Sequence, residues 1–367
     1  VNDLNRFGAQ RGEMQSLFEK FFPYVIALLF LVIVGVYGSL GLKVASENVI
    51  MLIAASIIGG YMALNIGAND VANNVGPAVG SRAMTMMMAL IIAAVFESAG
   101  ALIAGGDVVS TISKGIIDPA QVQNSQIFID AMMAALIAAA IWVNLATVLN
   151  APVSTTHSVV GGVMGAGIAA VGFSLVNWTT LGAIAASWVI SPLLGGIIAA
   201  LFLAFIKLNI IYTDDKIASA RRWVPILIAI MAGCFASYLT LKGLKRVWKA
   251  DAQSIALIGF GVFALVWAIT HPIIRRQSEG MENRNRSLRK LFQIPLICSA
   301  ALLSFAHGAN DVANAIGPLA AILSAVESGA VTAKAAVPIW VMIIGAFGIS
   351  LGLFIYGPKL VRMVGAQ

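Results

Sequence analysis

The sequence is poor in charged residues and contains only two cysteines. Asp, Glu, Lys and Arg make up 11% of its 367 residues, whereas 60% are hydrophobic, and the mean hydropathy is +0.93. Soluble domains carry about 25% charged residues, so this composition excludes an ordinary soluble protein. Cys234 and Cys298 lie in apolar stretches with no metal-ligand spacing between them, and we interpret both as small buried hydrophobic residues. The composition predicts an all-α protein that crosses the lipid bilayer many times.

Long charge-free stretches are the main feature of the chain. Residues 131–206 contain no Asp, Glu, Lys or Arg. A helix crosses the hydrocarbon core with about 20 residues, so this stretch must fold back at least twice. Five further apolar stretches are each long enough for one span: 24–42, 48–69, 223–241, 252–274 and 291–310. We expect about ten transmembrane helices, the first of which is too long for the apolar core of a signal peptide.

Basic residues gather in three loops between the predicted spans. Residues 207–222 contain four, residues 242–251 contain four and residues 275–290 contain six. One span separates each loop from the next, so the first and third share a face, which the positive-inside rule places in the cytoplasm. We therefore expect both ends of this chain to be cytoplasmic, at a plasma or inner membrane. The net charge of +7 reflects this topology, and no nucleic acid partner is expected.

Two nearly identical strings, GANDVANNVGP at residues 67–77 and GANDVANAIGP at residues 308–318, lie far apart in the chain. Six predicted spans separate the two spans that carry them, so the two motif helices should run in opposite directions. Inverted-topology repeats have this pattern, with the substrate site near the membrane midplane between the repeats. We divide the chain into an extra N-terminal span (1–47), a first repeat (48–210), linking spans with a cytoplasmic loop (211–292) and a second repeat, incomplete at its C-terminal end (293–367).

Each string places one aspartate and at least two asparagines in an apolar stretch. An ionisable group at membrane depth costs from about 3 to more than 10 kcal/mol and normally belongs to a substrate or ion path. Asp70 and Asn73, like Asp311 and Asn314, are three residues apart, so each pair can face one ligand. The flanking glycines and proline predict interrupted helices, whose freed backbone groups would bind ions. Interhelical hydrogen bonds from Asn and close packing at Gly are the alternative.

A run of hydroxyls lies in the middle of the longest charge-free stretch, in the string PVSTTHSVVGG. Ser154, Thr155 and Thr156 follow a proline that can start a helix. Together with the free amides of a helix N-terminus they would form a neutral cradle for an oxyanion. The alternative is that these hydroxyls only cap the helix or bond to its carbonyls. His157 has no partner at zinc-like spacing, so we expect a packing role for it.

Glu97, in the string VFESAG, is a further carboxylate inside an apolar stretch. It is either an interior hydrogen-bonding residue or a candidate for cation or proton coupling. Arg82 and Lys114 are more typical of loop charges that extend to the membrane surface. Two aspartates alone would repel an anion, so bound cations or protons would be needed to offset the repulsion. Anion affinity would then rise when the cation is bound.

The duplicated GANDVAN strings and the PVSTTH string resemble those of the inorganic phosphate transporter family, which includes the type III sodium-phosphate cotransporters. The resemblance extends from about residue 48 to residue 357. It implies alternating-access symport of inorganic phosphate with Na⁺ or H⁺, no further cofactor and no enzymatic activity. It also implies roles for the motif residues: Asp70, Asn73, Asp311 and Asn314 would line the phosphate and cation sites, Asn69 and Asn310 would support the cations, Ser154, Thr155 and Thr156 would contact phosphate, and Glu97 would matter for transport.

The chain departs from this family at its C-terminal end. Family members carry a second hydroxyl string of the PxSTTH type after the second GANDVAN string, and this chain ends at Gln367 without one. We therefore expect the chain to be a shortened version of a longer protein, and a fragment with impaired transport is the alternative.

Other functions remain open at this point. Another tetrahedral oxyanion such as sulfate is the nearest competing substrate, although hydrogen-phosphate can donate a proton to an aspartate and sulfate cannot. An intramembrane hydrolase would use Ser154 or Thr155 with His157, and would give the paired GAND strings no role. A receptor or scaffold would not need duplicated buried carboxylates. Helix-rich transporters often form homodimers, and the sequence does not identify an interface for one.

Overall fold

The structure, a computed structural model, describes residues 2–40, 48–106, 116–117, 124–243, 248, 250–329 and 337–365, and only the backbone of 2–20 and 364–365. Lys114 lies outside the described residues, and Arg82 is exposed in the turn after the first motif helix. The helices are α1 (Asn2–Leu40), α2 (Val49–Gly80), α3 (Met86–Ala104), α5 (Ser125–Val148), α6 (Thr155–Val171), α7 (Trp178–Ile206), α8 (Lys216–Lys242), α9 (Ala252–Gln277), α10 (Asn285–Leu291), α11 (Gln293–Ser328) and α12 (Ile339–Gly365), with short turns η3 (Phe173–Leu175) and η4 (Lys207–Ile211) on either side of α7.

Polar capping residues determine where several of these helices begin. The side chain of Thr85 accepts a hydrogen bond from the Met88 amide at the start of α3. Asn124, Asn177 and Asp215 do the same at the starts of α5, α7 and α8. Such caps satisfy amides that have no partner in the first turn of a helix, and each stabilises by about 1 kcal/mol. They therefore help to set where these four helices begin.

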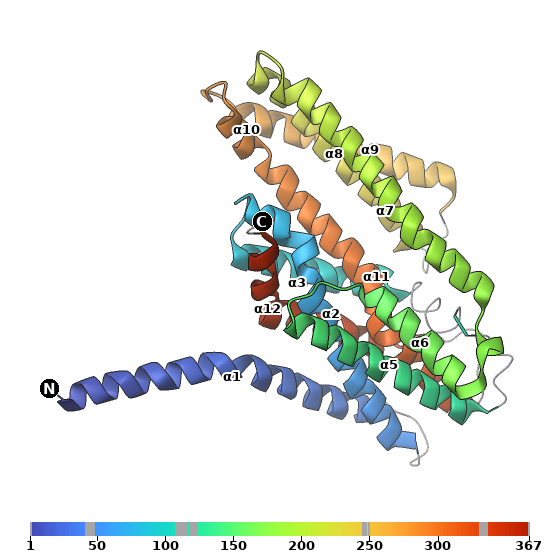
Figure 1. Cartoon of the computed structure of the whole chain (residues 1–367). Helices are drawn as coiled ribbons and strands as arrows, with labels where there is room; N and C mark the ends of the chain where they lie inside the picture. Colours follow the sequence, from blue (N-terminus) through green and yellow to red (C-terminus); the bar gives the residue numbers. More distant parts are fainter. Residues whose placement is uncertain are drawn as a thin grey trace.

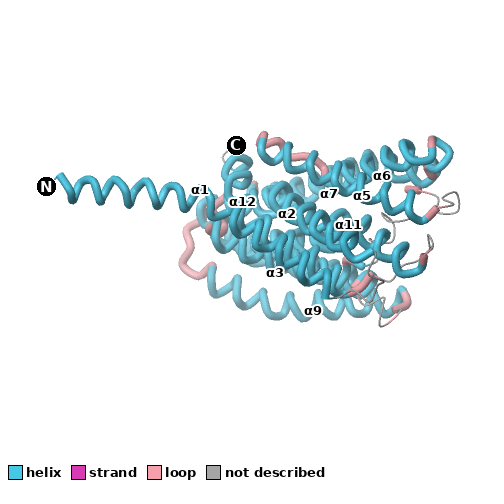
Figure 2. The backbone as a smooth tube through the Cα atoms, turned by 90° about the horizontal axis from the view of Figure 1, so that it is seen from below, coloured by secondary structure: helices cyan, strands magenta, loops and turns pink. Residues whose placement is uncertain are grey.

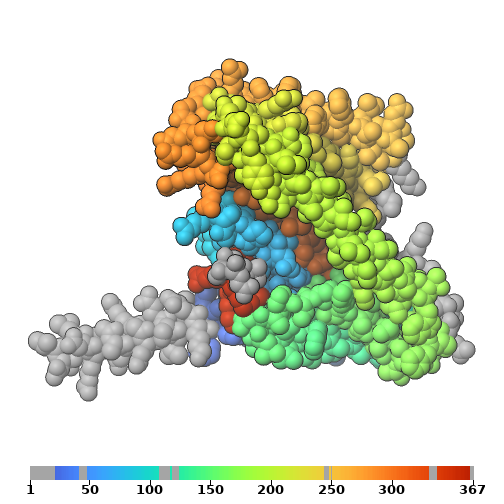
Figure 3. Space-filling view, turned by 45° about the horizontal axis from the view of Figure 1, so that its top comes forward, coloured from blue at the N-terminus to red at the C-terminus, as the bar shows by residue number. Residues whose placement is uncertain are grey.

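The four helices α2, α3, α11 and α12 form the centre of the molecule (Figure 1). The α5–α6 hairpin packs on one side of this centre, and the pair α8–α9 lies on the other side. In both Figure 1 and Figure 3, α7 runs obliquely from the hairpin to the α8–α10 group. The tube view in Figure 2 shows α1 extending well beyond the other helices.

Nine helices in the described part of the chain are long and apolar enough to cross a membrane, and α6, with 17 residues, is shorter. No residue of α7 is buried, and Leu193, Ile197 and Leu201 on it are 61%, 57% and 65% exposed. Exposing such surface to water costs about 25 cal/mol per Å² of apolar area, whereas lipid solvates it. The exposed apolar surface of α7 therefore fits a lipid environment, and the protein is a multi-pass membrane protein. With α6 included, the described helices agree with the expected count of about ten.

The two motif helices run in opposite directions, as the count of spans predicts. Gly59, near the start of α2, lies against Ala315 and Leu319 in the second half of α11. Asp70, further along α2, lies instead near His307 in the first half of α11. This antiparallel crossing places the two GAND strings side by side at the centre of the molecule.

Glycine contacts repeat in matching positions of the two halves. A Cβ atom at Gly100 of α3 would collide with the carbonyl oxygen of Phe305, three residues before the second GAND string. A Cβ atom at Gly352 of α12 would collide in the same way with the carbonyl oxygen of Leu64, three residues before the first. Between them, the Ser98 and Ser350 hydroxyls form a 2.6 Å hydrogen bond. The pairs α2–α3 and α11–α12 are therefore related as inverted repeats in their packing.

We expect Gly100→Ala and Gly352→Ala to destabilise the protein to a similar extent. Each added methyl group would press on a backbone carbonyl that cannot move independently of its helix, at a cost of about 1–3 kcal/mol. Melting temperatures of the purified variants in lipid nanodiscs measure the effect. Gly161→Ala is the control, because no atom lies within 4 Å of a Cβ at this position. Two unequal losses would contradict the packing relation between the halves.

The prediction of interrupted motif helices is wrong. α2 continues through Gly67, Gly76 and Pro77, and α11 continues in the same way through the second string. The glycines serve close packing: a Cβ atom at Gly67 would collide with the Ile349 backbone, and one at Gly308 with that of Glu97. The chain is broken instead between α5 and α6, where the N-terminus of α6 reaches the interior between α2 and α11.

Candidate functional site

The turn between α5 and α6 is held in place by Asn69 of the first motif. The amide oxygen of Asn69 accepts a hydrogen bond from the Val153 amide at 3.1 Å. Its amide nitrogen donates to the Ala151 carbonyl at 3.3 Å and to the Thr147 hydroxyl at 3.0 Å. Asn69 thus fixes the turn that carries the hydroxyl string, and its expected support of a cation stays a prediction.

The hydroxyl string begins α6, but its proline is not in the first turn of the helix as expected: Pro152 lies two residues before the N-cap. Ser154 is the N-cap, and its Oγ accepts a hydrogen bond from the His157 amide at 3.2 Å. The hydroxyl hydrogen of Ser154 is not used in this bond and can still be donated to a ligand. Ser154 therefore caps the helix, as the alternative interpretation of these hydroxyls expected. It also lines the cavity described below.

Thr155 joins the two motif aspartates. Its hydroxyl lies 3.2 Å from Oδ2 of Asp70 and 3.1 Å from Oδ2 of Asp311. A hydroxyl has one hydrogen, so it can donate to only one of these carboxylates at a time. Thr155 is 2% exposed and Asp70 is 6% exposed, so the three groups meet away from bulk water. The two halves of the site predicted from the repeated strings are thus brought together at one side chain.

Asn314 extends the polar cluster towards the next hydroxyl. Its amide nitrogen donates to the Thr156 hydroxyl at 2.9 Å and to Oδ1 of Asp311 at 3.2 Å. This confirms that the aspartate and the asparagine of the second string share a face. The Oδ1 atom of Asn314 is buried and has no hydrogen-bond partner in the described structure. A buried acceptor without a donor is costly, and a bound cation would compensate it.

The first string differs in which asparagine faces inwards. Asn73, predicted to line the site with Asp70, is exposed on α2 and is not among the residues that line the cavity. Asn74 is buried instead, and its amide nitrogen donates to Oε1 of Glu97 at 2.7 Å. Positions three and four after Asp70 both lie near its helix face. The packing of α3 against this part of the site selects Asn74.

His307 is the functional candidate that the sequence interpretation missed. Its Nε2 atom lies 3.0 Å from Oδ2 of Asp311 and 3.6 Å from Oδ2 of Asp70, and its Nδ1 atom lies 3.3 Å from Oε1 of Glu97. It directly precedes the second GAND string, where the first string is preceded by Ile66. Reading the residues around each string, and not only the shared letters, would have shown this difference.

Asp70, His307 and Asp311 form a group that could hold a metal ion. One ligand atom from each lies within 4.8 Å of the others. Hard cations such as Na⁺ favour oxygen ligands, and the two carboxylates with the free Oδ1 of Asn314 offer them. Glu97 is 1% exposed and contacts this group through Nδ1 of His307.

A cavity of about 680 Å³ lies beside this cluster. One wall consists of the α6 start and the second motif: Ser154, Thr156, His157, Asn310, Asp311 and Asn314. The lining also includes Ile184, Ser187, Trp188 and Ser191 of α7 and Lys242 at the end of α8. The His157 ring packs against Trp188 with a centroid distance of 3.9 Å, which is the packing role expected for this histidine. The cavity is large enough for a small oxyanion and several waters.

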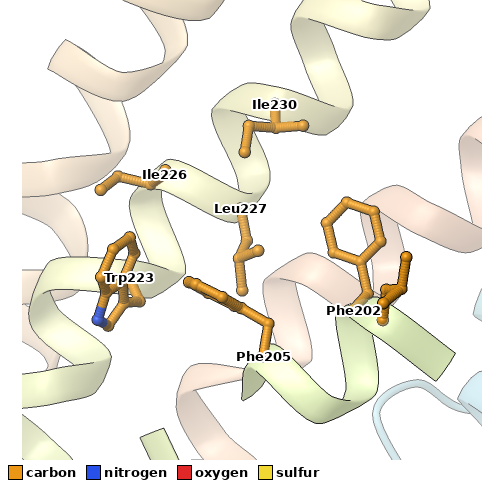
Figure 4. A pocket seen from close by; sticks show the side chains of 7 residues that line it. Phe202, Phe205, Trp223, Ile226, Leu227 and Ile230 are labelled. Carbon is orange, nitrogen blue, oxygen red and sulfur yellow. The ribbon is translucent and has the colours of Figure 1, made fainter. Parts of the chain in front are cut away.

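A second cavity, of about 310 Å³, lies between α7 and α8 (Figure 4). It is lined by Leu201, Phe202, Phe205, Trp223, Ile226, Leu227 and Ile230. These side chains are hydrophobic, and the Trp223 indole is the only polar group among them. This cavity therefore offers no carboxylate, amide or hydroxyl to an ion and is not a candidate for the polar site.

Inverted helix pairs that enclose a buried polar cluster, with a cavity beside it, are typical of membrane transport proteins. Residues 66–367 match the phosphate transporter family, and the chain belongs to this family. A Helicobacter pylori (strain J99) protein named "Putative phosphate permease" is 49% identical over 93% of this chain, which spans 64% of that relative's length. A Pyrococcus abyssi protein of the same description is 36% identical over 86% of this chain and 77% of its own length.

A solved structure is also similar. It is described as the sodium-dependent phosphate transporter and matches with a TM-score of 0.81 at 37% sequence identity, over 86% of this chain and 78% of its own. The family expected from the GANDVAN and PVSTTH strings is thereby confirmed, as is the all-helical membrane fold.

Proposed function

We propose that the protein transports inorganic phosphate by cation-coupled symport and alternating access, and that it is not an enzyme. The observation that carries this proposal is the meeting of Asp70, Asp311 and the Thr155 hydroxyl at the N-terminus of α6. The arrangement combines oxyanion donors with cation ligands in one buried cluster. Membership of the phosphate transporter family supports phosphate as the substrate.

Phosphate would be held by the start of α6. The Thr156 and Ser154 hydroxyls and the amide of Asn314 line the cavity, and the first-turn amides of α6 add a partial positive charge. Ionised Asp70 and Asp311 accept hydrogen bonds, so a hydrogen-phosphate can donate to one of them. Sulfate, which has no proton to donate, remains the alternative substrate.

Na⁺ is the proposed co-substrate, with H⁺ as the alternative. The name of the 37% identical structure, a sodium-dependent phosphate transporter, supports Na⁺. The carboxylates of Asp70 and Asp311 would bind the ion, together with Oδ1 of Asn314 and the exposed amide of Asn310. Bound cations would cancel the repulsion between the aspartates and phosphate, which couples the two substrates.

Glu97 would contribute to coupling as a positioning residue. It lies 3.3 Å from Nδ1 of His307, whose other nitrogen contacts Asp311 at 3.0 Å. Asn74 fixes Glu97 in turn through its 2.7 Å hydrogen bond. The corresponding residues of the second repeat, Ile349 and Ala315, cannot form such a chain, so the two halves of the site are not equivalent.

The cavity would face the outside of a plasma or inner membrane. Lys242 in its wall lies at the C-terminal end of α8, and the basic segment predicted to be cytoplasmic lies at the N-terminal end of the same helix. Both ends of the chain would be cytoplasmic. A hydrolase that uses His157 as its base gains no support, because the His157 ring lies against Trp188.

Uptake of radiolabelled phosphate into proteoliposomes tests this function. An inward Na⁺ gradient, an inward H⁺ gradient and no gradient are compared, with unlabelled sulfate as competitor. We expect uptake that depends on the Na⁺ gradient and resists sulfate. Uptake driven equally by both gradients would overturn sodium coupling, and equal competition by sulfate would overturn phosphate selectivity.

A further inference from the structure

One face of α7 is turned towards the cavity. Ile184, Ser187, Trp188 and Ser191 are spaced three and four residues apart and all line it. The next apolar positions, such as Val189 and Leu193, are 62% and 61% exposed. α7 therefore presents two serines, beside Ile184 and Trp188, to the cavity and an apolar surface elsewhere. The Ser187 hydroxyl already donates to the Ile184 carbonyl at 2.6 Å, whereas the Ser191 hydroxyl has no hydrogen-bond partner among the described residues.

Lys242 shares this cavity. It ends α8, its side chain is exposed, and no other lysine or arginine occurs among the described residues that line the cavity. The cavity lining also includes Asp311. A carboxylate in the lining repels a phosphate that approaches from water. The exposed ammonium group of Lys242 offsets this repulsion, because a positive charge raises the local concentration and the arrival rate of an anionic ligand.

We propose that Lys242, with the Ser191 hydroxyl, forms an outer anion subsite that captures phosphate before it moves to the α6 start. This inference rests on the proposed transport of phosphate and adds a second binding position to it. The subsite would recognise a multivalent oxyanion by charge and by one hydroxyl donor. It contains no carboxylate, so it would not need a bound cation. Capture would then be independent of Na⁺, whereas the inner site would require it.

The inference predicts an effect on the apparent affinity and not on the maximal rate. For Lys242→Ala we expect KM for phosphate to rise by about tenfold at low ionic strength, the lower range of electrostatic steering, with kcat retained. Lys242→Arg should restore KM, because it keeps the charge. The KM difference should shrink as choline chloride is added, because salt screens exposed charges. Lys290→Ala, at the end of α10, is the matched control: an exposed lysine in the last turn of a helix, outside the cavity.

A charge series at one position separates charge from shape. Lys242→Cys is made in a background with Cys234→Ala and Cys298→Ala, and is then modified with a trimethylammonium or a sulfonate methanethiosulfonate reagent. The positive adduct should lower KM and the negative adduct should raise it. An equal response to both adducts would overturn the subsite.

A binding measurement keeps this test separate from the transport proposal. Phosphate should slow modification of Ser191→Cys, made in the same cysteine-free background with Lys242 retained, in the purified chain with or without Na⁺. Protection without any uptake would support the subsite while transport fails. Sodium-driven uptake with neither protection nor a charge effect on KM would overturn the subsite and leave the transport proposal standing.

Discussion

Asp311→Asn should abolish sodium-driven phosphate uptake, with an initial rate reduced roughly 100-fold, near the upper range of typical coupling between two ligands. Asparagine has the same shape: its amide oxygen can accept from the Asn314 amide, and its NH₂ group can donate to the Thr155 hydroxyl, so the local packing survives. The substitution removes the negative charge and one of the two oxygens that would bind the cation. The initial rate of radiolabelled phosphate uptake into proteoliposomes with an inward Na⁺ gradient measures this loss.

Asp130→Asn provides the matched control. Asp130 is an exposed aspartate on α5 and accepts a hydrogen bond from Gln126, which an amide oxygen can also do. It should leave uptake unchanged. Wild-type uptake by Asp311→Asn would mean that the charge of this carboxylate has no part in coupling.

His307→Leu should have the largest effect on stability. The imidazole contacts the carboxylates of Asp70, Glu97 and Asp311, and all three lie in the interior. Removing one partner from a buried charged cluster leaves uncompensated charge and costs about 3–5 kcal/mol. We expect a clear fall in the melting temperature in nanodiscs and no phosphate uptake. His271→Leu, a half-buried histidine beside Trp267 on α9, should change neither.

A double variant shows whether Glu97 acts through His307. If the two side chains form one unit, Glu97→Gln should recover part of the stability lost in His307→Leu, because it removes a carboxylate that has lost its partner. The two substitutions would then be non-additive, as expected for residues in contact. Additive losses would contradict the role of Glu97 as a positioning residue.

Much of the fold could be predicted from the sequence, because membrane spans are limited by the thickness of the bilayer. The apolar stretches and the opposed direction of α2 and α11 both follow from length and count. The helix breaks could not be predicted, because glycine and proline can either interrupt a membrane helix or lie within a continuous one that packs closely against its neighbours. At Gly67 and Gly308 the absence of a side chain allows another backbone to approach, and this depends on a partner helix that the local sequence does not reveal.

The centre of the site could be predicted, but its surroundings could not. Two copies of GANDVAN and one hydroxyl string were enough to expect Asp70, Asp311 and Thr155 together, and they meet. The choice between Asn73 and Asn74 depends on where α3 packs, because both lie near the face of Asp70. His307 lies just outside the repeated letters and has no counterpart in the first copy, so comparing the two strings hides it.

The central claim is that a cation at the two aspartates makes the site accept phosphate. Equilibrium binding of radiolabelled phosphate to the purified protein, measured at increasing Na⁺ with choline replacing it, tests this claim most directly. We predict that phosphate affinity rises with Na⁺, and that Na⁺ affinity rises with phosphate by the same factor, because binding linkage is reciprocal. The rise should be lost in Asp311→Asn. A phosphate affinity that stays constant over the whole range of Na⁺ would contradict the claim.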